Sequence, residues 1–234
     1  MPELPAPLPP ERRTVGQVVA ESIQAYRRDF WRCLPLGVPL AVADQLSVHE
    51  SAVVQVLVYW VTSPLFVAAY LWACRIVLHA RPTRTAAVLG VLIWLPFPML
   101  RALYIIPGLA WLALMGLAVP VAMVERSPFR AALIRGRQLA LAGYGHALGS
   151  LCALVVVVGI AANVLSALLH SQGEAGQRVA VFLSEVVLSP LLYLGGALLY
   201  VDQSARHAVR SPHARLHPPV DAEPAGRADA QVEP

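Results

Sequence analysis

Long apolar runs separated by short polar segments make up most of the chain. A helix needs about 20 apolar residues to cross a bilayer. Six runs approach or exceed that length, at 30–46, 52–78, 85–103, 109–124, 145–170 and 179–201. The pattern predicts an all-α fold, a polytopic bundle of six transmembrane helices. The second run is longer than a bilayer needs, so we expect it to tilt or protrude.

The third and fourth runs are short, and the dipeptide Pro107-Gly108 lies between them. Two interpretations are open for this pair. Both runs cross the membrane, or together they form a helical hairpin that re-enters on the same side. We favour two crossings.

A polar boundary, Glu125 to Pro128, ends the fourth run and leads into a basic segment at 129–141. Ser127 is suited to cap a helix, and Pro128 to occupy its first position. The arginines of this segment are Arg130, Arg135 and Arg137. Because Arg130 and Arg137 share one helix face, we expect a cytoplasmic basic surface helix between spans four and five.

The chain begins with a proline-rich stretch at 1–13, which we expect to be disordered, as we do the tail at 204–234. Between them lies the predicted membrane domain, 14–203. Its first element is an amphipathic helix at 14–28, in which Thr14 and Gln17 have the spacing of a capping box. This helix lies in the headgroup layer or packs on the protein's own loops.

Composition supports a membrane protein, because 57% of the residues are hydrophobic and only 14% are charged. A soluble domain carries about a quarter charged residues. The net charge is +4, and all 18 basic residues are arginine. They form no basic stripe with interleaved aromatic residues, so we predict no nucleic-acid partner.

The positions of the arginines predict the orientation. With six spans, the arginine-rich segments at 12–32, 81–84, 126–137 and 206–215 fall on one side. The opposite loops hold Arg178, with Arg101 near the edge of a span. The positive-inside rule then places both termini in the cytoplasm.

Several short motifs accompany this layout. They are Ile106-Pro107-Gly108, Val119-Pro120, Glu125, Ala131-Ala132-Leu133-Ile134-Arg135 with Gln138-Leu139, and Tyr200 with Asp202. In these motifs, and in layout over residues 14–206, the chain resembles a bacterial family of integral membrane proteins. This is the membrane domain fused to some glycerophosphoryl diester phosphodiesterases, which is also found alone in uncharacterised proteins. The chain departs from the family pattern at Gly136, where a serine is common, and at Gln203, where an arginine is usual.

The resemblance implies a six-helix module in the bacterial inner membrane. It carries over no catalytic site, because the phosphodiesterase chemistry belongs to a separate barrel domain for which this chain has no room. The residues themselves show no metalloprotease motif, phosphate-binding loop, nucleophile elbow or cluster of metal ligands. Cys33, Cys74 and Cys152 are isolated and read as small buried residues. We therefore predict no enzymatic activity, no cofactor and no metal.

Polar groups inside membrane spans are candidates for function. Four lie in the half of the bundle predicted to face outward, namely Asp44, Arg101, Asn163 and Glu185. One interpretation is a polar cavity open to the outside, in which Arg101 pairs with Asp44 or Glu185. The other is a set of residues near span ends that reach the headgroups separately. In the cytoplasmic half, Asp202 lies near a helix end, where it is expected to reach water.

Two functions from different classes follow. The first is a non-enzymatic accessory or scaffold for membrane or envelope processes, and the alternative is a transporter or lipid-handling protein that uses the outward polar cavity. The expected partners are membrane lipids, with anionic lipids as one option, while other membrane proteins and the oligomeric state stay open.

Overall fold

The computed structural model describes residue 9, residues 12–168 and residues 173–210, and the expected disordered flanks lie mostly outside this part. All its regular elements are helices. They are α1 (Val15–Arg28), α2 (Phe30–Cys33), η2 (Leu34–Gly37), α3 (Val38–Ser47), α4 (Ala52–Val61), α5 (Ser63–Leu78), α6 (Arg84–Trp94), α7 (Phe97–Leu103), α8 (Ile105–Met115), α9 (Ala118–Val124), α10 (Phe129–Ala142), α11 (Tyr144–Leu168), α12 (Gly173–Leu188) and α13 (Pro190–Arg210). The predicted all-α class is confirmed.

Prolines explain why most predicted spans consist of two helices. Proline lacks the amide hydrogen that a helix interior needs and clashes with the preceding turn. Pro35 lies in the 3-10 segment between α2 and α3, Pro64 opens α5, and Pro96 precedes α7. Pro190 starts α13 directly after α12. The span without a proline, α11, is one continuous helix of 25 residues.

Four helical stretches are long and apolar enough to cross a membrane: Arg84–Leu103, Ile105–Val124, Tyr144–Leu165 and Arg178–Arg210. The pair α4 and α5 gives a fifth if it is one span, bent by 51° at its break. The α2–α3 region, predicted as span one, does not meet this criterion because its helices are too short and interrupted.

The third and fourth predicted spans form an antiparallel pair. The two stretches have 20 residues each, which is about 30 Å of helix and matches the hydrocarbon core of a bilayer. In this pair α6 packs against α9, and α7 packs against α8 on either side of the extended residue Tyr104. The lengths agree with two crossings.

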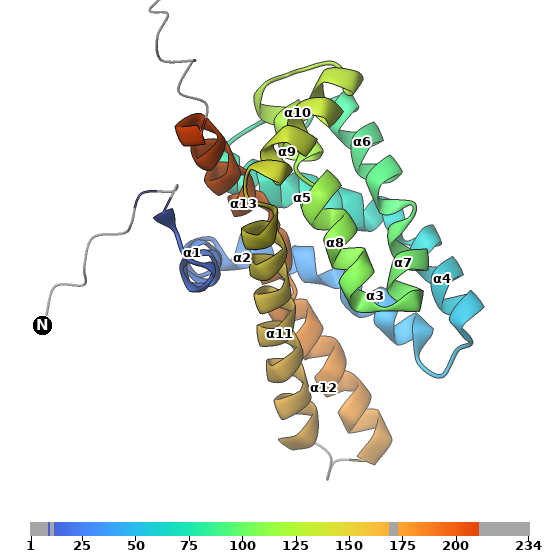
Figure 1. Cartoon of the computed structure of the whole chain (residues 1–234). Coiled ribbons are helices and arrows are strands. Elements are labelled where there is room, and N and C mark those ends of the chain that lie inside the picture. Colours follow the sequence, from blue (N-terminus) through green and yellow to red (C-terminus); the bar gives the residue numbers. More distant parts are fainter. Residues whose placement is uncertain (1–8, 10–11, 169–172, 211–234) are drawn as a thin grey trace, which may run out of the picture.

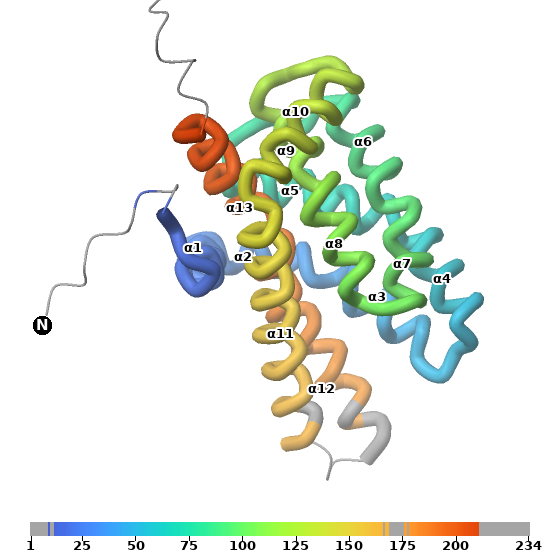
Figure 2. Tube along the Cα trace, viewed as in Figure 1, coloured from blue at the N-terminus to red at the C-terminus, as the bar shows by residue number. Residues whose placement is uncertain are grey.

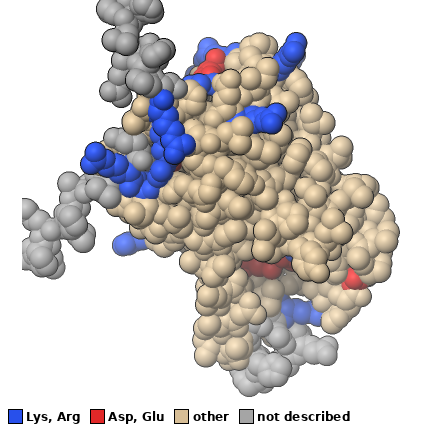
Figure 3. Space-filling model, viewed as in Figure 1, with Lys and Arg blue, Asp and Glu red and all other residues tan. Residues whose placement is uncertain are grey.

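Arginine side chains gather at one end of the molecule. On the face seen in Figure 3 most of them lie around the end formed by α1, α10 and α13 in Figure 1, and a smaller basic patch lies in the lower part of the view. The paired helices α11 and α12 extend to the opposite end (Figure 1). The residues directly before α1 lie near the end of α13, as Figure 2 also shows. This polarity of charge is the one expected from the sequence.

The amphipathic helix α1 begins with the predicted capping box between Thr14 and Gln17. It packs against α11 and α13, and is seen nearly end-on in Figure 1, so it lies across those helices. Val18, Ser22 and Tyr26 form its buried side. The apolar face is therefore used against other helices of the bundle.

Two boundaries differ from the predictions. Helix α10 begins at Phe129 with Pro128 as its N-cap, and the Ser127 hydroxyl accepts no capping hydrogen bond, because the extended backbone at Pro128 sets the helix start one residue later. The disordered tail was expected to begin at Ser204, but α13 continues to Arg210. In this last part of the helix, Arg206 donates a 2.6 Å hydrogen bond to the carbonyl of Arg13. The helical stretch ends beyond the apolar residues because polar contacts hold its last turns.

Candidate functional site

A cavity of about 460 Å³ lies between α8 and α11, with walls from α3, α4, α5, α6, α7, α12 and α13. Most of its lining is apolar. Residues that line it include Ile105, Leu109, Leu112, Ala113, Leu151, Val155, Val158, Gly159, Ala162, Val181, Leu192 and Leu199. Its volume lies within the range of about 300 to 1,000 Å³ that is typical of small-molecule sites.

Charged side chains lie together at one place in this lining. Arg101 on α7 places Nη2 3.4 Å from Oδ1 of Asp44 on α3. The same Asp44 oxygen accepts a hydrogen bond from the hydroxyl of Tyr59 on α4. The guanidinium of Arg101 also stacks over the Tyr59 ring, 4.2 Å from its centroid. These three side chains, from three different helices, form one compact polar group.

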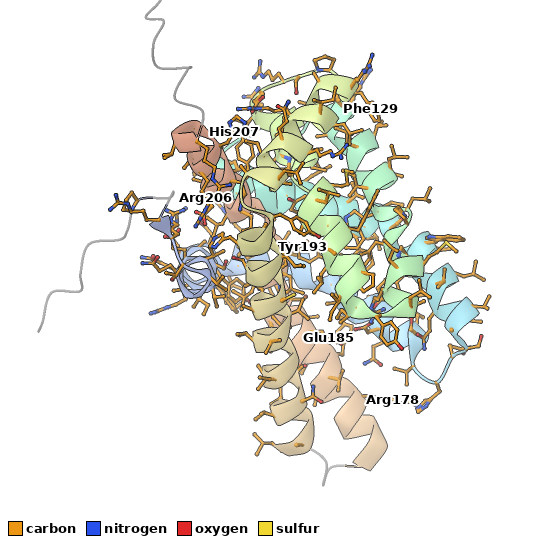
Figure 4. All side chains as sticks on the ribbon, in the orientation of Figure 1. Phe129, Arg178, Glu185, Tyr193, Arg206 and His207 are labelled. Atoms are coloured by element: carbon orange, nitrogen blue, oxygen red, sulfur yellow. The ribbon has the colours of Figure 1, made fainter. Side chains whose placement is uncertain are left out.

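Glu185 on α12 joins this group. It lines the same cavity as Asp44, on a helix that packs against α3. Oε2 of Glu185 is buried and has no hydrogen-bond partner among the described residues. Figure 4 places Glu185 on the inner part of α12, and Figure 3 shows acidic atoms in the hollow beside the α11–α12 pair.

Asn163, the fourth predicted polar residue, and the nearby glutamines contribute less. Asn163 lines the cavity, but its amide donates a 2.7 Å hydrogen bond to the carbonyl of Gly159 on its own helix. Gln45 and Gln55 donate to backbone carbonyls of Arg178 and Glu50. The structure thus brings three of the four candidates together and places the fourth elsewhere on the same wall.

Sequence reasoning missed the aromatic part of this site. Tyr59, Phe66, Trp94 and Phe97 form a continuous series, with ring centroids 5.6, 5.0 and 4.6 Å apart, and all four line the cavity. Their spacing along α4 to α7 follows no single period. The position of Tyr59 could have been found, because the short turn after Ser47 brings α4 back beside Asp44.

A second polar cluster lies at the arginine-rich end, and its centre corrects a prediction. Asp202 was expected to reach water, but its side chain is only 1% exposed. Arg13 Nη1 lies 2.9 Å from Asp202 Oδ1, and His146 Nε2 lies 3.2 Å from Oδ2. Asp202 is buried because α1 covers this part of α13, and the residues before α1 bring Arg13 over it.

Glu21 on α1 belongs to the same cluster, since its Oε1 lies 2.9 Å from Arg13 Nε. Burial raises the pKa of Glu21, while Arg13 lowers it and the charge of Asp202 raises it. Partial loss of hydration outweighs the nearby arginine. This cluster connects α1 to α11 and α13.

The basic helix α10 divides its arginines between two roles. Arg135 lies 3.8 Å from Glu125 and contacts His207 on α13. Arg130 and Arg137 are exposed, as are Ile134 and Leu141 between and after them. These four residues recur at helical spacing and form one mixed basic and apolar face.

Cys33 and Cys74 are buried as predicted, whereas Cys152 is half-buried. Among the described residues, no three His, Cys, Asp or Glu side chains are placed to hold a metal ion. Family models, curated protein sequences and solved structures show no match to this chain.

Proposed function

We propose that this protein binds an amphiphilic molecule within the membrane, as a transporter or lipid-handling protein. The observation that carries this proposal is the cavity itself, whose walls are apolar and whose polar side chains gather around Asp44, Arg101 and Glu185. An apolar chain fits the walls, while a polar headgroup needs partners at a defined place. An accessory or scaffold role, the first hypothesis from the sequence, has no need of such a cavity.

We further propose six membrane spans in a bacterial inner membrane, with α2 and α3 as the first and both termini in the cytoplasm. The collection of arginines at one end supports this orientation. A reporter active only in the periplasm should give signal when fused after Gly173 and none when fused at the C-terminus. Signal from the C-terminal fusion would mean an odd number of spans.

The binding proposal is tested by filling the cavity. Gly159 lines the cavity, and a Cβ atom added there meets no atom within 4 Å. Gly145 on the same helix also has open space around it but is not part of the lining. Gly159→Leu and Gly145→Leu therefore add the same volume to α11, inside and outside the cavity.

The measurement is the thermal stability of the purified protein in a non-ionic detergent as dodecanol is added. The wild-type protein and Gly145→Leu should be stabilised in a saturable way, because ligand binding favours the folded state. Gly159→Leu should show no such response. Equal responses from both variants would place dodecanol outside the cavity and contradict the proposal.

A further inference from the structure

The polar residues of the cavity, Asp44, Arg101 and Glu185, favour one chemical class of headgroup. Building on the function proposed above, we infer that the amphiphile bears a protonated primary amine, which Asp44 and Glu185 hold beside the aromatic series of α4 to α7.

Hydrogen bonding supports a headgroup that donates. Tyr59 and Arg101 both direct their donors to Oδ1 of Asp44. Oε2 of Glu185 has no donor from the part of the chain that the structure describes, although it is buried. A buried acceptor without a hydrogen-bond donor is unfavourable, and an ammonium group supplies three N–H donors. An ammonium placed between the two carboxyl groups would supply the donor that Glu185 lacks.

Charge supports the same choice. The carboxyl groups of Asp44 and Glu185 both line the cavity, while the cation that lines it with them, Arg101, already contacts Asp44 and the Tyr59 ring. Arg178 precedes Glu185 by two helical turns, about 10 Å along α12, and its side chain is exposed farther out (Figure 4). This part of the cavity therefore has two acidic side chains, Asp44 and Glu185, for the one arginine, Arg101, that lines it.

The aromatic series provides an independent observation. Tyr59, Phe66, Trp94 and Phe97 line the cavity together with the carboxyl groups, and Tyr59 contacts Asp44 directly. Ring faces carry partial negative charge and attract cations, and an anionic headgroup would be repelled by them. Carboxyl groups and aromatic rings together favour an ammonium group over a phosphate or a carboxylate.

The test compares three probes of one chain length, dodecylamine, dodecanol and dodecanoate, binding to the full-length protein in a non-ionic detergent at neutral pH. The amine should bind about tenfold more tightly than the alcohol, since hydrogen bonds to charged groups are the stronger kind. Dodecanoate should bind more weakly than dodecanol.

The variant Glu185→Gln should remove the preference for the amine and keep the binding of dodecanol, which also shows that its cavity is intact. Glu50→Gln is the matched control, because Glu50 is an exposed acid in the turn between α3 and α4 and does not line the cavity. It removes the same charge and should leave the preference unchanged.

The outcomes separate this inference from the proposed function. If none of the probes binds the wild-type protein, the binding function itself is wrong. If the amine and the alcohol bind equally, the cavity binds amphiphiles but the two carboxyl groups satisfy each other with a shared proton, which overturns the inference. Tighter binding of dodecanoate would make Arg101 the headgroup partner and would also overturn it.

Discussion

Nη2 of Arg101 lies 3.4 Å from Oδ1 of Asp44, and this ion pair joins α7 to α3 at the edge of the cavity. The two side chains are 35% and 27% exposed, so the pair is neither fully hydrated nor fully enclosed. Isolated exposed pairs contribute little, whereas removing one partner of an enclosed pair leaves a charge without compensation. The contribution of this pair is therefore best measured by comparing single and double variants.

We expect Arg101→Ala and Asp44→Ala each to lower the stability of the protein in detergent. The double variant should lose less than the sum, because the second change no longer strands a charge. A coupling of about 1 kcal/mol is expected for such contacting residues. Thermal unfolding of the wild-type protein and the three variants measures it. Strict additivity would show that the two side chains interact with water separately.

Removal of Arg13 should loosen α1. Arg13→Gln leaves the buried carboxylate of Asp202 with His146 as its remaining contacting side chain. The expected loss is about 2 kcal/mol, below the range for a fully stranded charge. Limited proteolysis should show faster cleavage within α1. In the control Arg28→Gln, the lost arginine is 68% exposed, and little change is expected.

Glu21 should make the stability depend on pH in a defined direction. Burial raises its pKa in the folded protein, so folding favours the protonated carboxyl. The stability from this group is complete below its unfolded pKa and falls as the pH rises towards the raised folded value. The difference in melting temperature between the wild-type protein and Glu21→Gln should therefore change across this interval. A constant difference would show that folding leaves the ionisation of Glu21 unchanged.

The exposed face of α10 should bind anionic headgroups. Replacing Arg130 and Arg137 by glutamine should reduce the stabilisation that anionic lipid gives, by about 1 kcal/mol for each arginine near the surface. Melting temperatures with anionic and with zwitterionic lipid, at low and high salt, measure the effect. Arg135→Gln is the control, because Arg135 contacts Glu125 and His207 on the protein itself. Equal stabilisation by both lipid classes would contradict an electrostatic contact.

The all-α class and the polar segments between the helices could be predicted from the sequence, because apolar runs and prolines determine helix formation through neighbouring residues. The tertiary use of α1 could not. Its apolar stripe fits a membrane surface and a protein surface equally well, and only the packing on α11 and α13 distinguishes them. The extension of α13 to Arg210 likewise depends on a contact with Arg13, far away in the sequence.

For the cavity, the charged residues could be found from the sequence because charges are rare within apolar runs. Arg101 and Asp44 followed from this rule and do lie together. Asn163, an uncharged polar residue, was found by the same reasoning. Its amide, however, donates a hydrogen bond to the backbone of its own helix, which short polar side chains can do. The aromatic rings were missed because aromatic residues are common in apolar spans, and their convergence depends on four helices.

The most direct test of the central claim is mass spectrometry of the amphiphiles that purify with the protein. The wild-type protein and Gly145→Leu should each carry a long-chain amphiphile close to one per chain after extensive washing with detergent. Gly159→Leu, with its added side chain inside the cavity, should lack it. If all three proteins carry the same amphiphile, or the wild-type protein carries none, the cavity is not the binding site that we propose.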